Sequence, residues 1–114
     1  RYRKDSIEIA ERLYIESMKL CNEFDIGKIA EIHISNIFMT FFFYGLTDLF
    51  AVSGYDKKKK KEIINSWMKN PNIEKAAVHA EVRRTVQKVA VFLVKHKMTR
   101  ALEGLFILKS FSQR

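Results

Sequence analysis

The chain has 114 residues, of which 47% are hydrophobic, and its net charge is +8. This length fits one domain with a single hydrophobic core, and the apolar content excludes a disordered chain. The lone cysteine, Cys21, excludes a fold held by internal disulfide bonds. We therefore expect a single helical domain over residues 1–114. Because the sequence starts at Arg1 and not at a methionine, we also expect it to be part of a longer chain.

The location expected from the sequence is the cytoplasm. No signal peptide is recognisable at the start. The longest uncharged run, residues 32–47, is shorter than the roughly 18–20 apolar residues of a membrane-spanning helix. We therefore expect no transmembrane segment.

Charge is distributed unevenly along the chain. Residues 1–54 contain six Lys or Arg and eight Asp or Glu, a net of −2. Residues 55–114 contain fifteen and five, a net of +10. A basic half of this kind suits a polyanion, such as a nucleic-acid backbone, or an acidic protein. The alternative is a lysine excess that only keeps the protein soluble.

Two long helices are predicted in the first half. Residues of the apolar face recur at spacings of three and four over residues 6–24, which predicts a helix with Cys21 as a buried side chain. A second helix is predicted after Asp25, as its N-cap, to about Ser53. Its middle, residues 37–44, is apolar nearly all round, which predicts a central helix buried on most sides.

Three more helices are predicted in the second half. The first follows Asp56 as N-cap and ends near Asn70, where Pro71 breaks the pattern. The other two are predicted over about 73–97 and about 99–111. We therefore expect an all-α fold, a single compact bundle of four to five antiparallel helices with the apolar second helix at its centre.

Catalytic and cofactor motifs are absent from the sequence. No glycine-rich loop follows a strand pattern, and there is neither HExxH nor a pair of CxxC motifs. None of His33, His79 and His96 lies three or four residues from another histidine or a cysteine, so no helical metal pair is predicted. We expect a non-catalytic binding module with no cofactor and no metal.

A run of five lysines opens the predicted third helix: Lys57, Lys58, Lys59, Lys60 and Lys61. At about 100° per residue they wrap around the helix and form no stripe. They also crowd the positive end of the helix dipole, so local stability does not explain them. They are either a solvated first turn or a contact for phosphates or acidic lipid head groups.

A basic ridge is predicted on the fourth helix. Its members lie within roughly 40° of one another around the helix axis and are Arg84, Lys88 and Lys95. The opposite face is predicted to pack in the core through four residues: Val82, Val86, Val89 and Leu93. Together with Arg83, the ridge would neutralise phosphates without reading bases. The alternative is an ordinary solvated helix face.

A weakly polar stripe follows the predicted second helix at spacings of three and four: His33, Asn36, Thr40, Tyr44 and Thr47. One interpretation is the side of this helix that reaches solvent. The other is a polar seam against a partner helix, a dimer or a small pocket, whose buried groups would need hydrogen bonds.

Two functions of different classes follow from these features. The first is binding of a polyanion, in particular the nucleic-acid backbone, by the basic half. The alternative is a protein-interaction or oligomerisation domain that uses the aromatic second helix, with an acidic protein or a second copy in a homodimer as partner. A weaker third hypothesis is a small apolar ligand enclosed by five side chains: Phe38, Met39, Phe41, Phe42 and Phe43.

Overall fold

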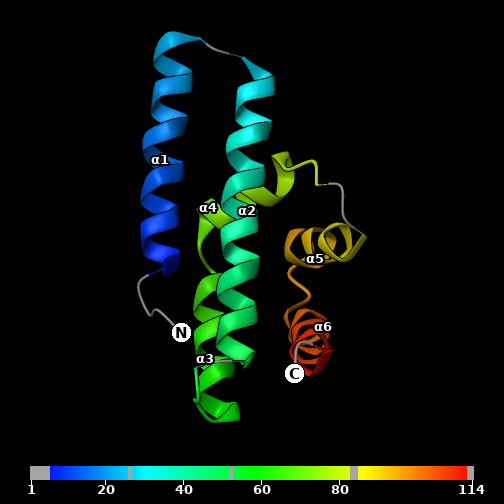
Figure 1. The fold of residues 1–114 in the computed structure, drawn as a ribbon. Coiled ribbons are helices and arrows are strands. Elements are labelled where there is room, and N and C mark those ends of the chain that lie inside the picture. Colours follow the sequence, from blue (N-terminus) through cyan, green and yellow to red (C-terminus); the bar gives the residue numbers. More distant parts are fainter. Residues whose placement is uncertain (1–5, 26, 52, 83–84, 113–114) are drawn as a thin grey trace.

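The protein is all-helical. The computed structural model describes residues 6–25, 27–51, 53–82 and 85–112, and these ranges contain six α-helices and no strand (Figure 1). In chain order the helices are α1 (Ser6–Phe24), α2 (Lys28–Ala51), α3 (Lys57–Met68), α4 (Pro71–His79), α5 (Thr85–Lys95) and α6 (Thr99–Ser112). The all-α prediction is confirmed. The described residues form six helices, whereas four to five were predicted.

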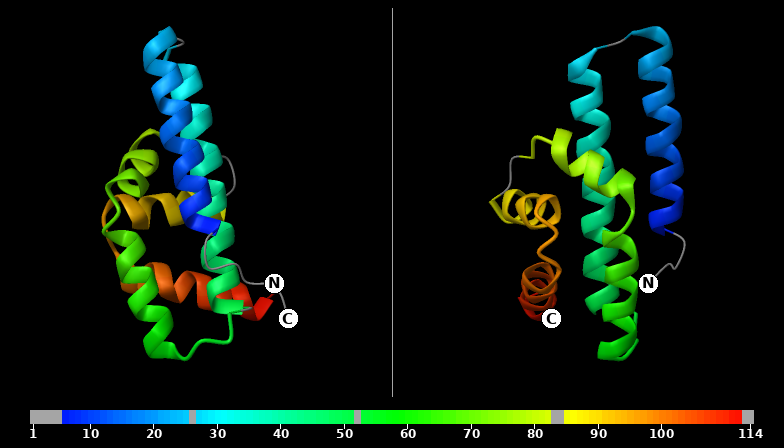
Figure 2. Two further views of the ribbon diagram at one scale, coloured as in Figure 1. Left: turned by 90° about the vertical axis from the view of Figure 1, so that its left-hand side faces the viewer. Right: turned by 180° about the vertical axis from the view of Figure 1, so that it is seen from behind.

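The helices do not form a uniformly antiparallel bundle. The first two, α1 and α2, form an antiparallel hairpin whose turn projects beyond the other helices, whereas α5 and α6 lie across the direction of α2 (Figure 2). The projecting hairpin gives the molecule extents of 44 × 27 × 23 Å. The crosswise layer exists because the chain bends between α4 and α5, where one long helix was predicted.

The central position of α2 follows from its aromatic side chains. Phe38 stacks on Tyr14 of α1 with ring centroids 4.8 Å apart. Phe42 meets the edge of Trp67 on α3 at 6.0 Å, and Phe43 lies 5.9 Å from Phe106 on α6. Phe38 and Phe42 lie on the same side of α2 but one turn apart along its axis, and Phe43 lies about 100° further around, so one helix reaches three others.

The predictions for the helix ends are confirmed at α1 and α3 and wrong at the start of α2. The bounds predicted for α1 are confirmed, and Asp56 caps α3 by accepting a 2.8 Å hydrogen bond from the Lys59 amide. Asp25 is not the N-cap of α2. It has a left-handed backbone with φ of 50°, and α2 begins only after Gly27, whose φ of 101° suits glycine.

The single helix predicted over 73–97 is wrong. The chain is helical to His79, Ala80 is extended, and α5 begins at Thr85. The sequence between these helices has neither proline nor glycine, so it carries no local break signal. The hydrogen bonds that replace the helical ones come from Asn36 of α2, which is distant in sequence.

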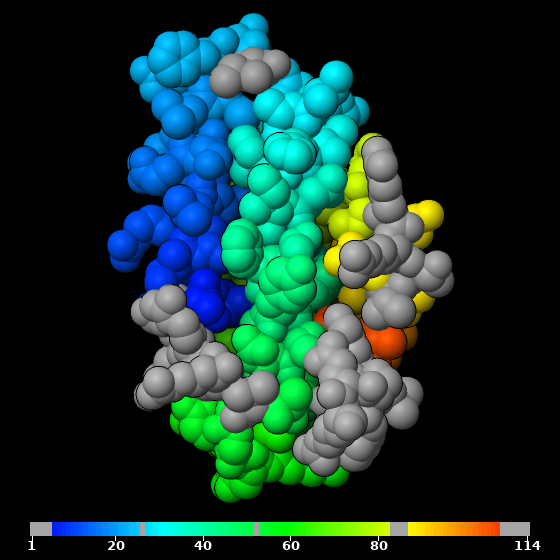
Figure 3. Space-filling view, in the orientation of Figure 1, coloured from blue at the N-terminus to red at the C-terminus, as the bar shows by residue number. Residues whose placement is uncertain are grey.

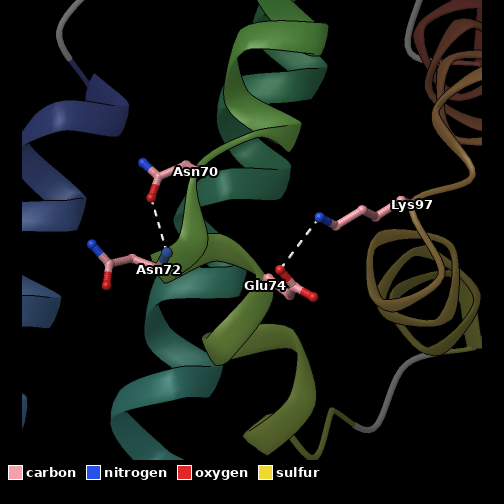
Figure 4. Close-up of polar contacts among 4 residues, drawn as sticks. All are labelled: Asn70, Asn72, Glu74 and Lys97. Atoms are coloured by element: carbon pink, nitrogen blue, oxygen red, sulfur yellow. Dashed lines mark hydrogen bonds and ion pairs between the residues drawn. The ribbon is translucent and has the colours of Figure 1, made fainter.

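Polar contacts fix the position of α4 (Figure 4). Asn70 caps the helix by accepting a 2.9 Å hydrogen bond from the Asn72 amide. The Asn72 side chain donates to the Glu11 carboxylate of α1 at 2.9 Å. On the other side, Glu74 forms an ion pair of 3.5 Å with Lys97, in the turn after α5. These contacts link α4 to both the hairpin and the crosswise layer.

One helix in the described part of the chain, α2, is long and apolar enough to cross a membrane by length and composition alone. Of its most apolar 18-residue window, 56% is buried by the other helices. The core helix of a soluble protein passes the same test, so this property is weak evidence for a membrane span.

A buried polar pair lies between α1 and α2. Burial raises the pKa of the Tyr14 phenol; the neighbouring Ser35 hydroxyl acts in the opposite direction, and the Glu31 carboxylate adds to the rise. Ser35 is fully buried, yet its Oγ atom makes no hydrogen bond of good geometry with any described residue. Burial therefore favours the neutral phenol over the charged phenolate.

We predict that two glycines respond differently to alanine. At Gly104 on α6 a Cβ atom meets nothing within 4 Å, so Gly104→Ala should stabilise the fold by about 0.4–1 kcal/mol. At Gly45 on α2 a Cβ atom would lie 2.6 Å from Ile7 Cδ1, so Gly45→Ala should gain less or destabilise. Urea unfolding measures the change in unfolding free energy of each variant. Ile7→Val removes the clashing methyl group and should make Gly45→Ala more favourable; strictly additive effects would contradict this contact.

We also predict a pH effect from Tyr14. Because its pKa is higher in the folded chain than in the unfolded chain, its contribution to stability is complete below about pH 10 and is lost as the pH rises further. Between about pH 8 and pH 11 the wild type should lose more unfolding free energy than Tyr14→Phe, which keeps the ring but cannot ionise. Equal losses in the two proteins would contradict the shift.

Candidate functional site

Two lysines of the predicted ridge, Lys88 and Lys95, lie within the described residues, and both are on the exposed face of α5. Lys88 and Lys95 are seven residues apart, so they lie on the same side of the helix about 10 Å apart along its axis. Both are exposed, and neither forms an ion pair or hydrogen bond with a described residue. By contrast, Lys97 is engaged with Glu74. The two α5 lysines are therefore available to an anion.

An aromatic pair lies beside these lysines and was missed by the sequence analysis. Phe92 is 54% exposed, and its ring centroid lies 4.4 Å from that of His96, one turn further along. Both rings lie on the arc that carries Lys88 and Lys95. Projection of residues 88–96 on a helical wheel would have found the pair, but the prediction assigned Val89 and Leu93 to the core and gave Phe92 no role.

The rest of the predicted ridge differs from expectation. Arg83 and Arg84 lie outside the described residues. Of the predicted packed face, Val82 precedes α5 but packs against the core, Leu93 is buried, and Val89 is 45% exposed. The buried arc is instead formed by four residues: Ala90, Val91, Leu93 and Val94. The break before α5 changes the rotation of this helix relative to the core, and that turns Val89 and Phe92 outward.

The lysine run forms the first turns of α3. Lys57, Lys58, Lys59 and Lys61 are exposed. Lys60 is half-buried: its Nζ donates to the Phe50 carbonyl at the end of α2, at 3.3 Å, and lies 5.9 Å from the Phe50 ring. One lysine of the run thus has a structural contact with the last turn of α2.

The lysine run and the α5 face are separate surfaces. Both figures that show the ribbon place α6 between α5 and the start of α3 (Figures 1 and 2). The contacts agree, since α6 packs on both helices. The residues predicted together as one polyanion surface are therefore divided between a face of α5 and one end of the molecule.

The predicted polar stripe on α2 contains one structural clamp. The Asn36 side chain donates to the Glu81 carbonyl at 3.1 Å and accepts from the Glu81 amide at 2.7 Å. The amide group thereby pairs with extended backbone as a neighbouring strand would. Asn36 holds the connection between α4 and α5 against α2.

The other stripe residues have different surroundings. Thr40 and Thr47 donate to carbonyls of their own helix, those of Asn36 at 2.8 Å and Phe43 at 2.9 Å. Thr47 is buried, and His33 and Tyr44 are exposed. The stripe is therefore part solvent-exposed face and part contact with the α4–α5 connection, and its five members do not form one site.

Two hollows flank the exposed ridge of α2 formed by Ile37 and Phe41. An open cleft of about 470 Å³ lies toward the α4–α5 connection and is lined by this ridge, three stripe residues and the connection: His33, Asn36, Ile37, Thr40, Phe41, Glu81, Val82 and Gln87. A smaller groove of about 60 Å³ lies between α1 and α2. Figure 3 shows α1 and α2 side by side on this face of the molecule.

The exposure of this ridge corrects the prediction that residues 37–44 are buried on most sides. Phe41 is 48% exposed and Tyr44 58%, whereas Met39 and Phe42 are fully buried. Because the five aromatic and methionine side chains of the ligand hypothesis are divided between surface and core, they do not enclose one apolar cavity.

Comparisons do not extend this picture: no protein-family model, curated protein or solved structure matches the chain. Among the described residues no group of three or more His, Cys, Asp and Glu side chains is placed to hold a metal ion. Cys21 is a buried free thiol on α1. The case for each candidate surface therefore rests on the exposure, charge and contacts of its own residues.

We predict that Asn36→Ala loosens the α4–α5 connection. The loss of two hydrogen bonds to an exposed segment should cost about 1–2 kcal/mol of unfolding free energy and speed hydrogen exchange of the Glu81 amide. Thr40→Val is the matched control, because its hydroxyl bonds only within α2. Unchanged exchange at Glu81 in Asn36→Ala would contradict the clamp.

Proposed function

We propose that this chain is a non-catalytic binding module that binds the nucleic-acid backbone through α5. The observation that carries the proposal is the pair of exposed, unpaired lysines, Lys88 and Lys95, on one side of this helix. A phosphate backbone is a row of negative charges, and lysines spaced along a helix neutralise it without reading sequence.

The charge around α5 supports the proposal. Residues 82–102 contain six Lys or Arg and no Asp or Glu. A segment without internal carboxylates keeps its positive potential toward solvent, and that potential draws in polyanions and speeds their association. Seven of the thirteen acidic residues lie within residues 6–51, in the α1–α2 hairpin; of the others, Glu81 and Glu103 border the segment, and Glu74 pairs with Lys97. The asymmetry would orient the protein with α5 toward the polyanion.

The second candidate function is protein interaction, favoured by the apolar ridge on the hairpin. Leu13, Ile37 and Phe41 are exposed beside the groove between α1 and α2. At the projecting turn, Phe24 and Ile29 are 67% and 85% exposed. Apolar side chains gathered in this way suit a protein partner, either another protein or a second copy of the chain.

We predict that nucleic-acid binding is steeply salt-dependent and depends on α5. The measurement is fluorescence anisotropy with labelled DNA of roughly 20 nucleotides, as single strand and as duplex, from about 50 to 200 mM salt. The double variant Lys88→Gln/Lys95→Gln should lower the slope of log K against log salt by up to about 1.4 for the single strand and about 1.8 for the duplex.

The matched control is Lys19→Gln/Lys28→Gln, which removes the same charge from the acidic hairpin. It should leave the slope within experimental error of the wild type, because these lysines are far from α5. No binding at low salt, binding that ignores salt, or an equal effect of the control pair would each contradict the proposal.

A further inference from the structure

We infer that the α5 face binds single-stranded nucleic acid by stacking an unpaired base on Phe92. This inference rests on the proposed function, because it names the class of nucleic acid that the same face accepts. The lysines alone would bind any polyanion. The Phe92 ring between them, with His96 beside it, adds a contact that only an accessible base can use.

The order of side chains along α5 matches the order of groups in a nucleotide chain. Each base is attached to a sugar with a phosphate on either side. Phe92 has Lys88 one turn before it and Lys95 about one turn after it, so a base on the ring would have a cation on each side. His96 lies 4.4 Å from the Phe92 ring, measured between centroids, and enlarges the aromatic surface.

The exposure of Phe92 favours a single strand over a duplex. Base faces in a duplex are covered by neighbouring bases, and those of a single strand can be splayed onto aromatic side chains. The helix that carries Phe92 has no Asn on its exposed arc, and Gln87 lines the cleft beside α2. With no amide beside the ring to pair with a base edge, the contact would tolerate any base sequence.

The decisive experiment changes the ring and leaves the charge intact. Phe92→Leu should lower affinity for a labelled oligothymidylate single strand by about fivefold or more, the loss of one base-stacking contact. Affinity for a DNA duplex and for inorganic polyphosphate, which has no bases, should stay within about twofold of the wild type. Phe92→Tyr keeps an aromatic ring and should retain single-strand binding.

Phe41→Leu is the matched control, because it makes the same change at a ring of similar exposure on α2. It should leave all three affinities unchanged. Phe92→Trp gives a direct signal: its emission should be quenched by the single strand and not by polyphosphate, over a constant background from Trp67. Circular dichroism and thermal melting of each variant establish that it is folded.

The outcomes separate this inference from the function on which it rests. Salt-dependent binding that Phe92→Leu leaves unchanged would overturn stacking and leave backbone binding by the lysines in place. An equal loss for all three probes, or the same loss in Phe41→Leu, would also overturn stacking. No binding of the wild type to any probe at low salt would overturn both, and attention would then move to the hairpin as a protein-docking surface.

Discussion

The fold depends on three phenylalanines on the buried side of α2. Phe38, Phe42 and Phe43 each pack against a ring on a different helix, and together they bring α1, α3 and α6 to a common axis. Truncation of one such buried ring to alanine typically costs about 3–5 kcal/mol, a large part of the stability of a domain this size. The contact between Phe43 and Phe106 joins α6, a helix of the crosswise layer, directly to α2.

The same helix divides its aromatic residues between core and surface. The rings that pack on other helices occupy one side, and Phe41 and Tyr44 occupy the other. A helix that is apolar all round need not be buried all round when the chain is too short to cover it. The outward aromatic residues of α2 and Phe92 of α5 are therefore exposed apolar side chains, like those at the turn of the hairpin.

The sequence predicted best what local chemistry determines. The periodic apolar face set the bounds of α1, and the position of Asp56 before a helical pattern identified the cap of α3. It failed between α4 and α5, because the break is held by Asn36, 45 residues from Glu81 in the chain. No local signal at residues 80–84 could have revealed a hydrogen bond made at that distance.

The candidate site was predictable in part for the same reason. Lys88 and Lys95 lie within one helix, so their common side follows from spacing alone. Which side of α5 faces the core depends on how the chain leaves α4. Val89 is exposed, contrary to the expected packing, and Phe92, which had no predicted role, is also exposed. The separation of the lysine run from α5 is likewise a property of the packing of α6, which no pattern within either segment encodes.

The projecting turn between α1 and α2 has a practical consequence for protein engineering. Gly27 is exposed, and a Cβ atom there would meet nothing within 4 Å. Inserted sequence is tolerated best at such exposed loop tips, where no packed side chain is displaced. A reporter domain joined at this turn would stand at the far end of the hairpin from the α3 end of the molecule (Figure 1).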